Sequence, residues 1–153
     1  MHFTIINPFN NITHHFLKIL SPKARLQRSA TCKYTGVKKD GISTIRFKTL
    51  NCGGISGSAK KSFEKRKRIF NSVKGTNDII ILTETKFKKS EMSKYKQDWN
   101  SGLLASCTPE LHAQAGVAIL FRHGLAIDII TEGHDQNGRV VWALVELYAK
   151  KFL

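Results

Sequence analysis

Two polar side chains follow the ends of two predicted strands. Glu84 comes shortly after the apolar run 79–82, and Asn51 directly follows the alternating segment 43–50. Four large apolar residues in a row are typical of a strand buried on both faces, in the middle of a layered α/β fold. Loops that leave a sheet edge are where binding and catalytic sites are built. If the two strands are neighbours, Asn51 and Glu84 reach the same rim.

The chemistry that suits this pair is the binding of a divalent cation against a phosphate. A hard cation such as Mg²⁺ takes oxygen ligands, often only one or two carboxylates, while water and substrate phosphate complete its shell. A nearby side-chain amide can orient the carboxylate or donate to a phosphoryl oxygen. Taken singly, Asn51 before two glycines is typical of a turn residue, and a glutamate after a strand is typically solvated.

The charge of the chain favours a polyanionic partner. Lys and Arg number 25 against 11 Asp and Glu, which gives a formal net charge of +14. Nucleic acid is the first expectation and an anionic membrane surface the second, and the alternative is a merely basic soluble protein. Three widely spaced cysteines without a CxxC pair favour a reducing compartment. No apolar stretch approaches the roughly 20 residues that cross a bilayer, and no signal peptide is recognisable.

The first quarter of the chain differs in composition from the rest. Residues 1–39 contain seven Lys or Arg and no Asp or Glu. We therefore predict a boundary near residue 43, with a basic leader over 1–43 that is flexible or unrelated to the fold. The leader could be a mitochondrial transit segment, a basic arm on nucleic acid or unselected sequence, and we favour the third interpretation.

The remainder, 44–153, has the pattern of a mixed α/β domain. Ile45 and Phe47 alternate with basic residues in a strand over 43–50. A helix over 59–74 begins at a Ser58 N-cap and ends at Gly75. The other predicted elements are strands over 78–82, 116–121, 125–131 and 139–147, a short helical stretch over 90–97, an irregular segment over 99–115, and a turn over 134–138.

The helix over 59–74 carries a dense basic run. Arg66 and Arg68 belong to the stretch 65–68, in which all four residues are basic. Such a run could bind phosphate or act as a nuclear-localisation patch. A solvated helix face is the interpretation that we favour, and Arg66 and Arg68 remain candidates for substrate contact.

Four segments in order resemble the endonuclease/exonuclease/phosphatase superfamily. They are 45–51, which ends in Leu-Asn; 78–86, which is similar to the family's strand ending in Gln-Glu-Thr; 116–121; and 135–141, which resembles an Asp-x-x-Gly-Arg strand start. The last segment is most similar to apurinic/apyrimidinic endonucleases and to the endonuclease domains of LINE-type retrotransposons. The resemblance covers roughly residues 44–153.

The resemblance implies a four-layer α/β sandwich and a Mg²⁺- or Mn²⁺-dependent phosphodiesterase (a hydrolase) that nicks DNA. Glu84 matches the family's metal-binding glutamate and Asn51 its active-site asparagine. Lys86 matches a cation found just after the glutamate. The remaining matched residues imply a structural turn: Asp135, Gly138 and Arg139. The implied partners are DNA and, in a longer parent protein, a reverse transcriptase domain, in a nuclear or cytoplasmic setting.

The sequence departs from the family's pattern at several positions, and these departures bear on the expected branch of the family and on the expected activity. Gly53 stands where repair enzymes usually carry an aspartate, and Thr83 replaces the glutamine before the glutamate, which favours the retrotransposon branch. The family's later Tyr, Asp-x-Asn and Ser-Asp-His motifs are not present. We therefore expect about half of a domain, with little or no nicking activity. The alternative is a non-catalytic basic nucleic-acid-binding module, and a lipid or inositol phosphatase of the same superfamily fits the basic surface less well.

Overall fold

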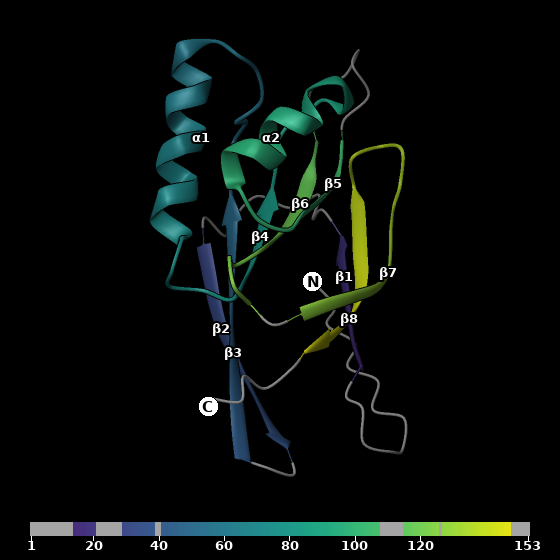
Figure 1. The fold of residues 1–153 in the computed structure, drawn as a ribbon. Helices are drawn as coiled ribbons and strands as arrows, with labels where there is room; N and C mark the ends of the chain where they lie inside the picture. The colour runs from purple at the N-terminus through teal and green to yellow at the C-terminus, as the bar shows by residue number, and fades with distance from the viewer. Residues whose placement is uncertain (1–13, 21–28, 39–40, 108–114, 126, 148–153) are drawn as a thin grey trace.

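A computed structural model describes the backbone of residues 14–20, 29–38, 41–107, 115–125 and 127–147, and the side chains of the same ranges from residue 45 to 146 (Figure 1). This part of the protein is a mixed α/β fold with two β-sheets and two α-helices. The fold class predicted from the sequence is thus confirmed at that level.

The larger sheet holds the two strands whose ends carry Asn51 and Glu84. Its five strands lie in the order β2-β3-β4-β6-β5, and only β3 and β4 are parallel. Helix α1 makes the crossover that a parallel pair requires. The bounds of these elements are β2 (Ser29–Lys38), β3 (Gly41–Asn51), α1 (Lys60–Val73), β4 (Ile79–Thr83), β5 (Leu103–Ser106) and β6 (Val117–Phe121).

The smaller sheet has three antiparallel strands in the order β1-β8-β7. They are β1 (His14–Leu20), β7 (Ile127–His134) and β8 (Val140–Leu147). The turn predicted over 134–138 joins β7 to β8, and β7 runs further towards it than the predicted strand over 125–131. A register shift between Ile129 and Thr131 interrupts the β7–β8 pairing.

The described elements form three layers, and β4 contributes to the core on both of its faces. Ile80 and Leu82 face α1 and α2 (Met92–Trp99), whereas Ile79 and Ile81 face the smaller sheet. Because successive residues of a strand point to opposite faces, a strand between two cores must be apolar throughout. This explains the uninterrupted apolar run in the sequence.

Helix α1 covers the outer face of the larger sheet, beside α2 (Figure 1). Phe70 and Val73 are buried on its inner side. The chain leaves the helix through Gly75, whose φ of 79° is readily adopted only by glycine. The predicted Ser58 N-cap is wrong: Ala59 occupies the N-cap position and makes no side-chain capping bond.

The prediction of an irregular segment over 99–115 is also wrong in part. Residues Leu103–Ser106 form β5, which pairs with β6 along its whole length. A four-residue strand is too short to show a clear period in the sequence, and its pairing with a distant strand stabilises it instead. The short helical stretch predicted over 90–97 is present as a 3₁₀ turn, Lys89–Glu91, followed by α2.

Two strands lie inside the segment predicted as a leader. β1 pairs with β8, and β2 pairs with β3, so that the predicted boundary near residue 43 falls within β3. Residues 1–13, 21–28 and 39–40 lie outside the described residues, and the division into two domains stays a prediction. Neither described helix combines the length and the apolar character that crossing a membrane requires.

Candidate functional site

The structure places Asn51 and Glu84 on one rim of the larger sheet. In the parallel β3–β4 pair Asn51 lies opposite Thr83, and the chains stay paired beyond the strands. The Cys52 amide donates to the Thr83 carbonyl at 2.9 Å, and the Gly54 amide donates to the Glu84 carbonyl at 2.7 Å. The two candidate residues therefore leave the sheet side by side, at the upper end of β3 and β4 in Figure 1.

The backbone around Glu84 is strained. Glu84 has a φ of 52° and Lys86 a φ of 57°, while Thr85 between them is buried. An L-residue in the left-handed region costs about 1 kcal/mol or more. The segment is held by the Thr85 amide, which donates to the Gly116 carbonyl at 3.0 Å, and by the Lys86 amide, which donates to the Ala115 carbonyl at 2.8 Å. Glu84 is therefore presented by a rigid loop, with its side chain exposed.

Glycine at 116 is required for this arrangement. A Cβ atom on Gly116 would lie 2.7 Å from the Lys86 amide nitrogen, and its φ of 111° disfavours other residues. Gly54 packs against the Lys86 side chain in a similar way, because a Cβ there would lie 3.0 Å from Lys86 Cδ. The Gly116 amide also donates to the Gly138 carbonyl at 2.8 Å, which ties the turn between β7 and β8 to the rim.

Asn51 is engaged in a local turn. Its Oδ1 accepts a hydrogen bond from the Gly53 amide at 2.9 Å, and the residue is exposed. This is the turn role expected of an asparagine before two glycines. The side-chain NH₂ group remains as a donor, so Asn51 is better suited to bond a phosphoryl oxygen than to contribute a metal ligand.

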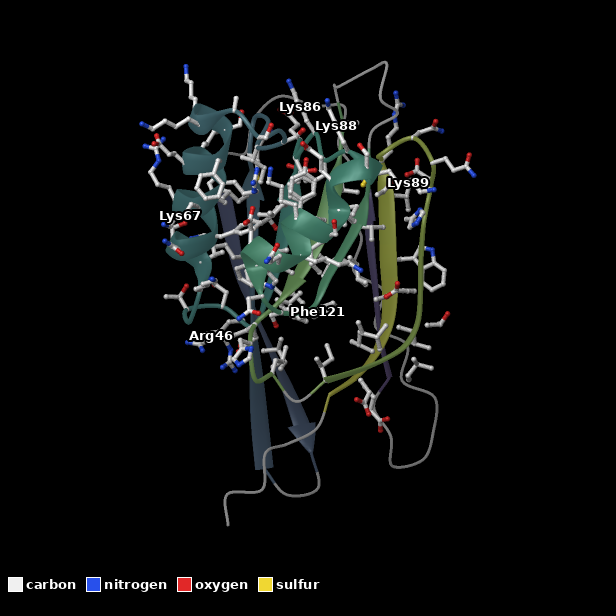
Figure 2. The ribbon with its side chains drawn as sticks, turned by 45° about the horizontal axis from the view of Figure 1, so that its top comes forward. Arg46, Lys67, Lys86, Lys88, Lys89 and Phe121 are labelled. Carbon is white, nitrogen blue, oxygen red and sulfur yellow. The ribbon has the colours of Figure 1, made fainter. Side chains whose placement is uncertain are left out.

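Cations surround the glutamate. Lys65 Nζ donates to the Gly53 carbonyl at 3.0 Å, and Lys86 lies over Gly54. Lys86 and Lys88 extend outward at the rim in Figure 2. Helix α1 begins beside this rim with Lys60 and Lys61, and its N-terminal amides add a positive partial charge. The rim is consequently positive apart from Glu84.

Arg66 lies inside the protein, whereas Arg68 is exposed. The Arg66 side chain has no solvent-accessible surface, and its Nε donates to Asp98 Oδ2 at 2.7 Å. Its Nη1 donates to the carbonyls of Ile55 and Gly57 at 2.9 and 3.2 Å, which fixes the loop after β3. Arg68 lies about 200° further around α1 and faces solvent. Of the two arginines considered for substrate contact, only Arg68 is accessible.

The same loop is held from its other side by α2. Tyr95 donates its hydroxyl hydrogen to Glu91 Oε2, and the Gly57 amide donates to the same carboxylate oxygen at 3.2 Å. The hydrogen bond from Tyr95 lowers the pKa of Glu91, while burial and the bond to Glu91 raise the pKa of Tyr95. Sequence reasoning missed this support, because its partners lie more than thirty residues apart.

Cys52 is a further residue at the site that sequence reasoning did not select. Its thiol is buried directly below the rim, and burial raises its pKa to about 12, against the opposing effect of Lys65 and with a smaller contribution from Glu84. A thiol with this pKa stays protonated at neutral pH and is a poor nucleophile. Cys52 therefore packs in the core beneath the site.

Asp135 organises the turn between β7 and β8. Its Oδ1 accepts hydrogen bonds from the amides of Arg139 and Val140 at 2.9 and 3.0 Å, and from the Ser106 hydroxyl at 2.5 Å. Burial raises the pKa of Asp135, but these bonds outweigh it and the net shift is downward. Gly138 has a φ of 70° and Arg139 is exposed. The turn is thus held to β5 through Ser106, a contact that the sequence did not indicate.

Among the residues that the structure describes, Glu84 is the carboxylate that the rim offers to a metal ion. Within the described ranges no three His, Cys, Asp or Glu side chains group in a way that could hold a metal. A comparison with models of known protein families found no match, and neither did a search of the curated proteins.

Proposed function

We propose that this chain contains the N-terminal half of a metal-dependent DNA endonuclease domain of the endonuclease/exonuclease/phosphatase type, of the retrotransposon branch. The observation that carries the proposal is the adjacency of Asn51 and Glu84 at the ends of two parallel strands. The strained backbone of Glu84 and Lys86 supports it, because strain of this kind persists mainly where a side chain has a task.

The complete domain that we propose is a four-layer sandwich, and the structure describes three of its layers. The outer face of the smaller sheet supports this, since Trp142 and Leu144 on β8 are only partly buried. On β7, Ile130 at the register shift is 47% exposed. Apolar surface of this kind favours a covering layer. A second helical layer, contributed by a longer parent protein, would bury it.

The metal proposed is Mg²⁺ or Mn²⁺, held by Glu84. One carboxylate satisfies the minimum that Mg²⁺ commonly accepts when water and phosphate oxygens complete its shell. Such an ion would stabilise negative charge on a phosphoryl oxygen when bound. Lys86 would place a second positive charge beside the same phosphate, and the Asn51 NH₂ group would donate to it. Because the described part of the rim carries a single carboxylate and no histidine, we expect little or no turnover from these residues.

Metal binding is tested most directly by Mn²⁺ titration of the ¹⁵N-labelled protein. A paramagnetic ion on Glu84 should broaden the amide signals of residues 51–54 and 84–86 before any others, and Glu84→Gln should abolish this broadening. Glu64→Gln, which neutralises an exposed carboxylate on α1, is the matched control and should change nothing. Broadening that survives in Glu84→Gln would contradict the proposed site.

Plasmid nicking in the presence of Mg²⁺ tests the activity itself. We expect at most a trace of nicking, which Glu84→Ala should remove. Robust turnover would contradict the expectation that half a domain is nearly inactive.

A reverse transcriptase domain in a longer parent protein, and a nuclear or cytoplasmic location, complete the proposal.

A non-catalytic nucleic-acid-binding module is the second candidate. The single carboxylate in the described part of the rim favours it, together with the cations at the same rim: Lys60, Lys61, Lys65, Lys86 and Lys88. Binding through phosphate contacts falls steeply with salt. If this candidate is correct, duplex DNA should bind without any need for Mg²⁺, and Glu84→Gln should bind at least as tightly as the wild type.

A further inference from the structure

A cleft of about 750 Å³ lies between the helical layer and the smaller sheet. Its volume is within the range of ordinary ligand sites. One wall comes from the start of α2 and the turn before it, the other from the end of β7. The strand β5 runs between these walls. The residues that carry the argument below are Lys89, Met92, Lys96, Leu104, Glu132 and Val141.

The cleft follows the open edge of β5. Leu103, Leu104 and Ala105 all line it, although successive residues of a strand point to opposite faces. A cavity that touches three consecutive residues must therefore run along the edge of the strand. β5 is the last strand of the larger sheet, and within the described part of the chain no strand pairs with its outer side.

The pairing with β6 shows which backbone groups face the cleft. The Gly102 carbonyl accepts a hydrogen bond from the Phe121 amide at 2.9 Å, in register with the β5–β6 ladder. Hydrogen-bonded pairs alternate along an antiparallel ladder, so Leu104 and Ser106 bond to β6. Leu103 and Ala105 consequently direct their N–H and C=O groups outward, into the cleft.

The side chains around this edge have a definite pattern of charge. Met92, Leu104 and Val141 make an apolar floor. Lys89 and Lys96 stand on the helical wall, and Lys89 lies on the side nearer β7 in Figure 2. Glu132 and Asp135 stand on the opposite wall. The Asp135 carboxylate is already engaged, because its Oδ1 accepts hydrogen bonds from Ser106 and from the amides of the turn. Among the residues that the structure describes, no ion pair joins the two walls.

We propose that this cleft binds an extended peptide that adds to the larger sheet as a strand beside β5. An exposed strand edge provides main-chain hydrogen bonds to such a ligand, and pockets for alternate side chains provide selectivity. Here the apolar floor takes every second side chain, and Lys89 and Lys96 take acidic side chains. Because β5 has four residues, the paired part of the peptide is short. The partner is thus an acidic segment in which apolar residues alternate with Glu or Asp.

The experiment uses an acetylated and amidated hexapeptide in which valine alternates with glutamate. Titrated into the ¹⁵N-labelled protein, it should shift the amide signals of Leu103 and Ala105 and slow their hydrogen exchange at least tenfold. Ala105→Pro removes one outward N–H without removing a bond to β6, a change that edge strands tolerate, and it should abolish binding. Unchanged affinity in Ala105→Pro would overturn the proposal.

A matched pair of charge reversals keeps the test valid if Ala105→Pro does not fold. Lys96→Glu should weaken binding about five- to tenfold, as expected for replacing an attraction by a repulsion at a partly exposed site. Lys94→Glu makes the same change on α2 outside the cleft and should alter the affinity less than twofold. Equal effects of the two variants would overturn the proposal. The proposal would also be overturned if the peptide did not bind, or if it shifted the amide signals of residues 51–54 and 84–86 and not those of β5. A third contradicting result would be hydrogen-exchange protection of β5 that rises with protein concentration in the absence of peptide, because a second copy of the chain would then be the occupant.

Discussion

Two carboxylates bracket β4, and they differ in nearly every respect. Asp78, just before the strand, is buried, and both of its oxygens are occupied: Oδ2 accepts a hydrogen bond from the Arg46 amide at 2.8 Å, and Oδ1 accepts one from Arg122 Nε at 3.0 Å. Glu84, just after the strand, is exposed on a left-handed backbone, and no ion pair holds it within the described ranges.

The comparison separates a structural end of the strand from the end that carries the proposed site. In Figure 2, Arg46 and Phe121 mark the end near Asp78, and Lys86 and Lys88 mark the opposite end. Near Asp78 opposite charges meet and the backbone is relaxed, so packing explains the residues that are present. Near Glu84 the backbone is strained, and no ion pair to a described residue neutralises the charge. These features cost stability, so a function is their better explanation.

The largest expected effect comes from removing the carboxylate at the structural end. Asp78→Ala would leave a backbone amide and two guanidinium groups without their acceptor. Because the Arg46 and Arg122 side chains are 46% and 33% exposed, water compensates in part, and we expect a loss of about 2–3 kcal/mol in the free energy of unfolding. Urea denaturation followed by circular dichroism measures it.

Glu84→Ala is the matched control at the other end of the same strand. It removes an exposed carboxylate and should change the free energy of unfolding by less than about 0.5 kcal/mol. Equal losses in the two variants would break the comparison, since Glu84 would then contribute to stability as Asp78 does.

A gain in stability is expected when the backbone strain at Glu84 is relieved. Glu84→Gly would remove the cost of a left-handed L-residue, offset in part by the greater entropy of glycine in the unfolded chain. We expect a net gain of about 0.5–1 kcal/mol in the same denaturation experiment, together with loss of the Mn²⁺-induced broadening described above. A loss of stability in Glu84→Gly would show that the glutamate side chain makes a stabilising contact.

The elements that carry Asn51 and Glu84 could be predicted from the sequence, because their patterns are local. The apolar run before Glu84 requires a strand with cores on both faces, and the residues after Asn51 are turn formers. The sequence left open whether these two strands are neighbours, and the structure shows that they pair in parallel. Resemblance to a known family added the roles of the residues, and those remain proposals.

What could not be predicted depends on contacts between distant segments. The burial of Arg66 could have been predicted, because the residue falls on the same stripe of α1 as Phe70 and Val73, but the groups that bind it could not. Its partner Asp98 is 32 positions away, and nothing local identifies it. The backbone strain at Glu84 was equally hidden, because it arises from the packing of that loop against Gly116.

The smallest effect on stability is expected at Asp135, a carboxylate that is less buried than Asp78 and less exposed than Glu84. Its pKa in the folded protein is lowered from 3.8, since hydrogen bonds from Ser106 and the turn amides outweigh burial. A depressed pKa contributes stability above the unfolded value, and this stability is lost as the pH falls through the folded value. Asp135→Asn should therefore cost a few tenths of a kcal/mol at pH 6, because water screens a partly exposed group. Denaturation at pH 6 and pH 3 should show the difference from wild type shrinking in acid. A difference that stays constant with pH would show that the shape of the side chain, and not its charge, holds the turn.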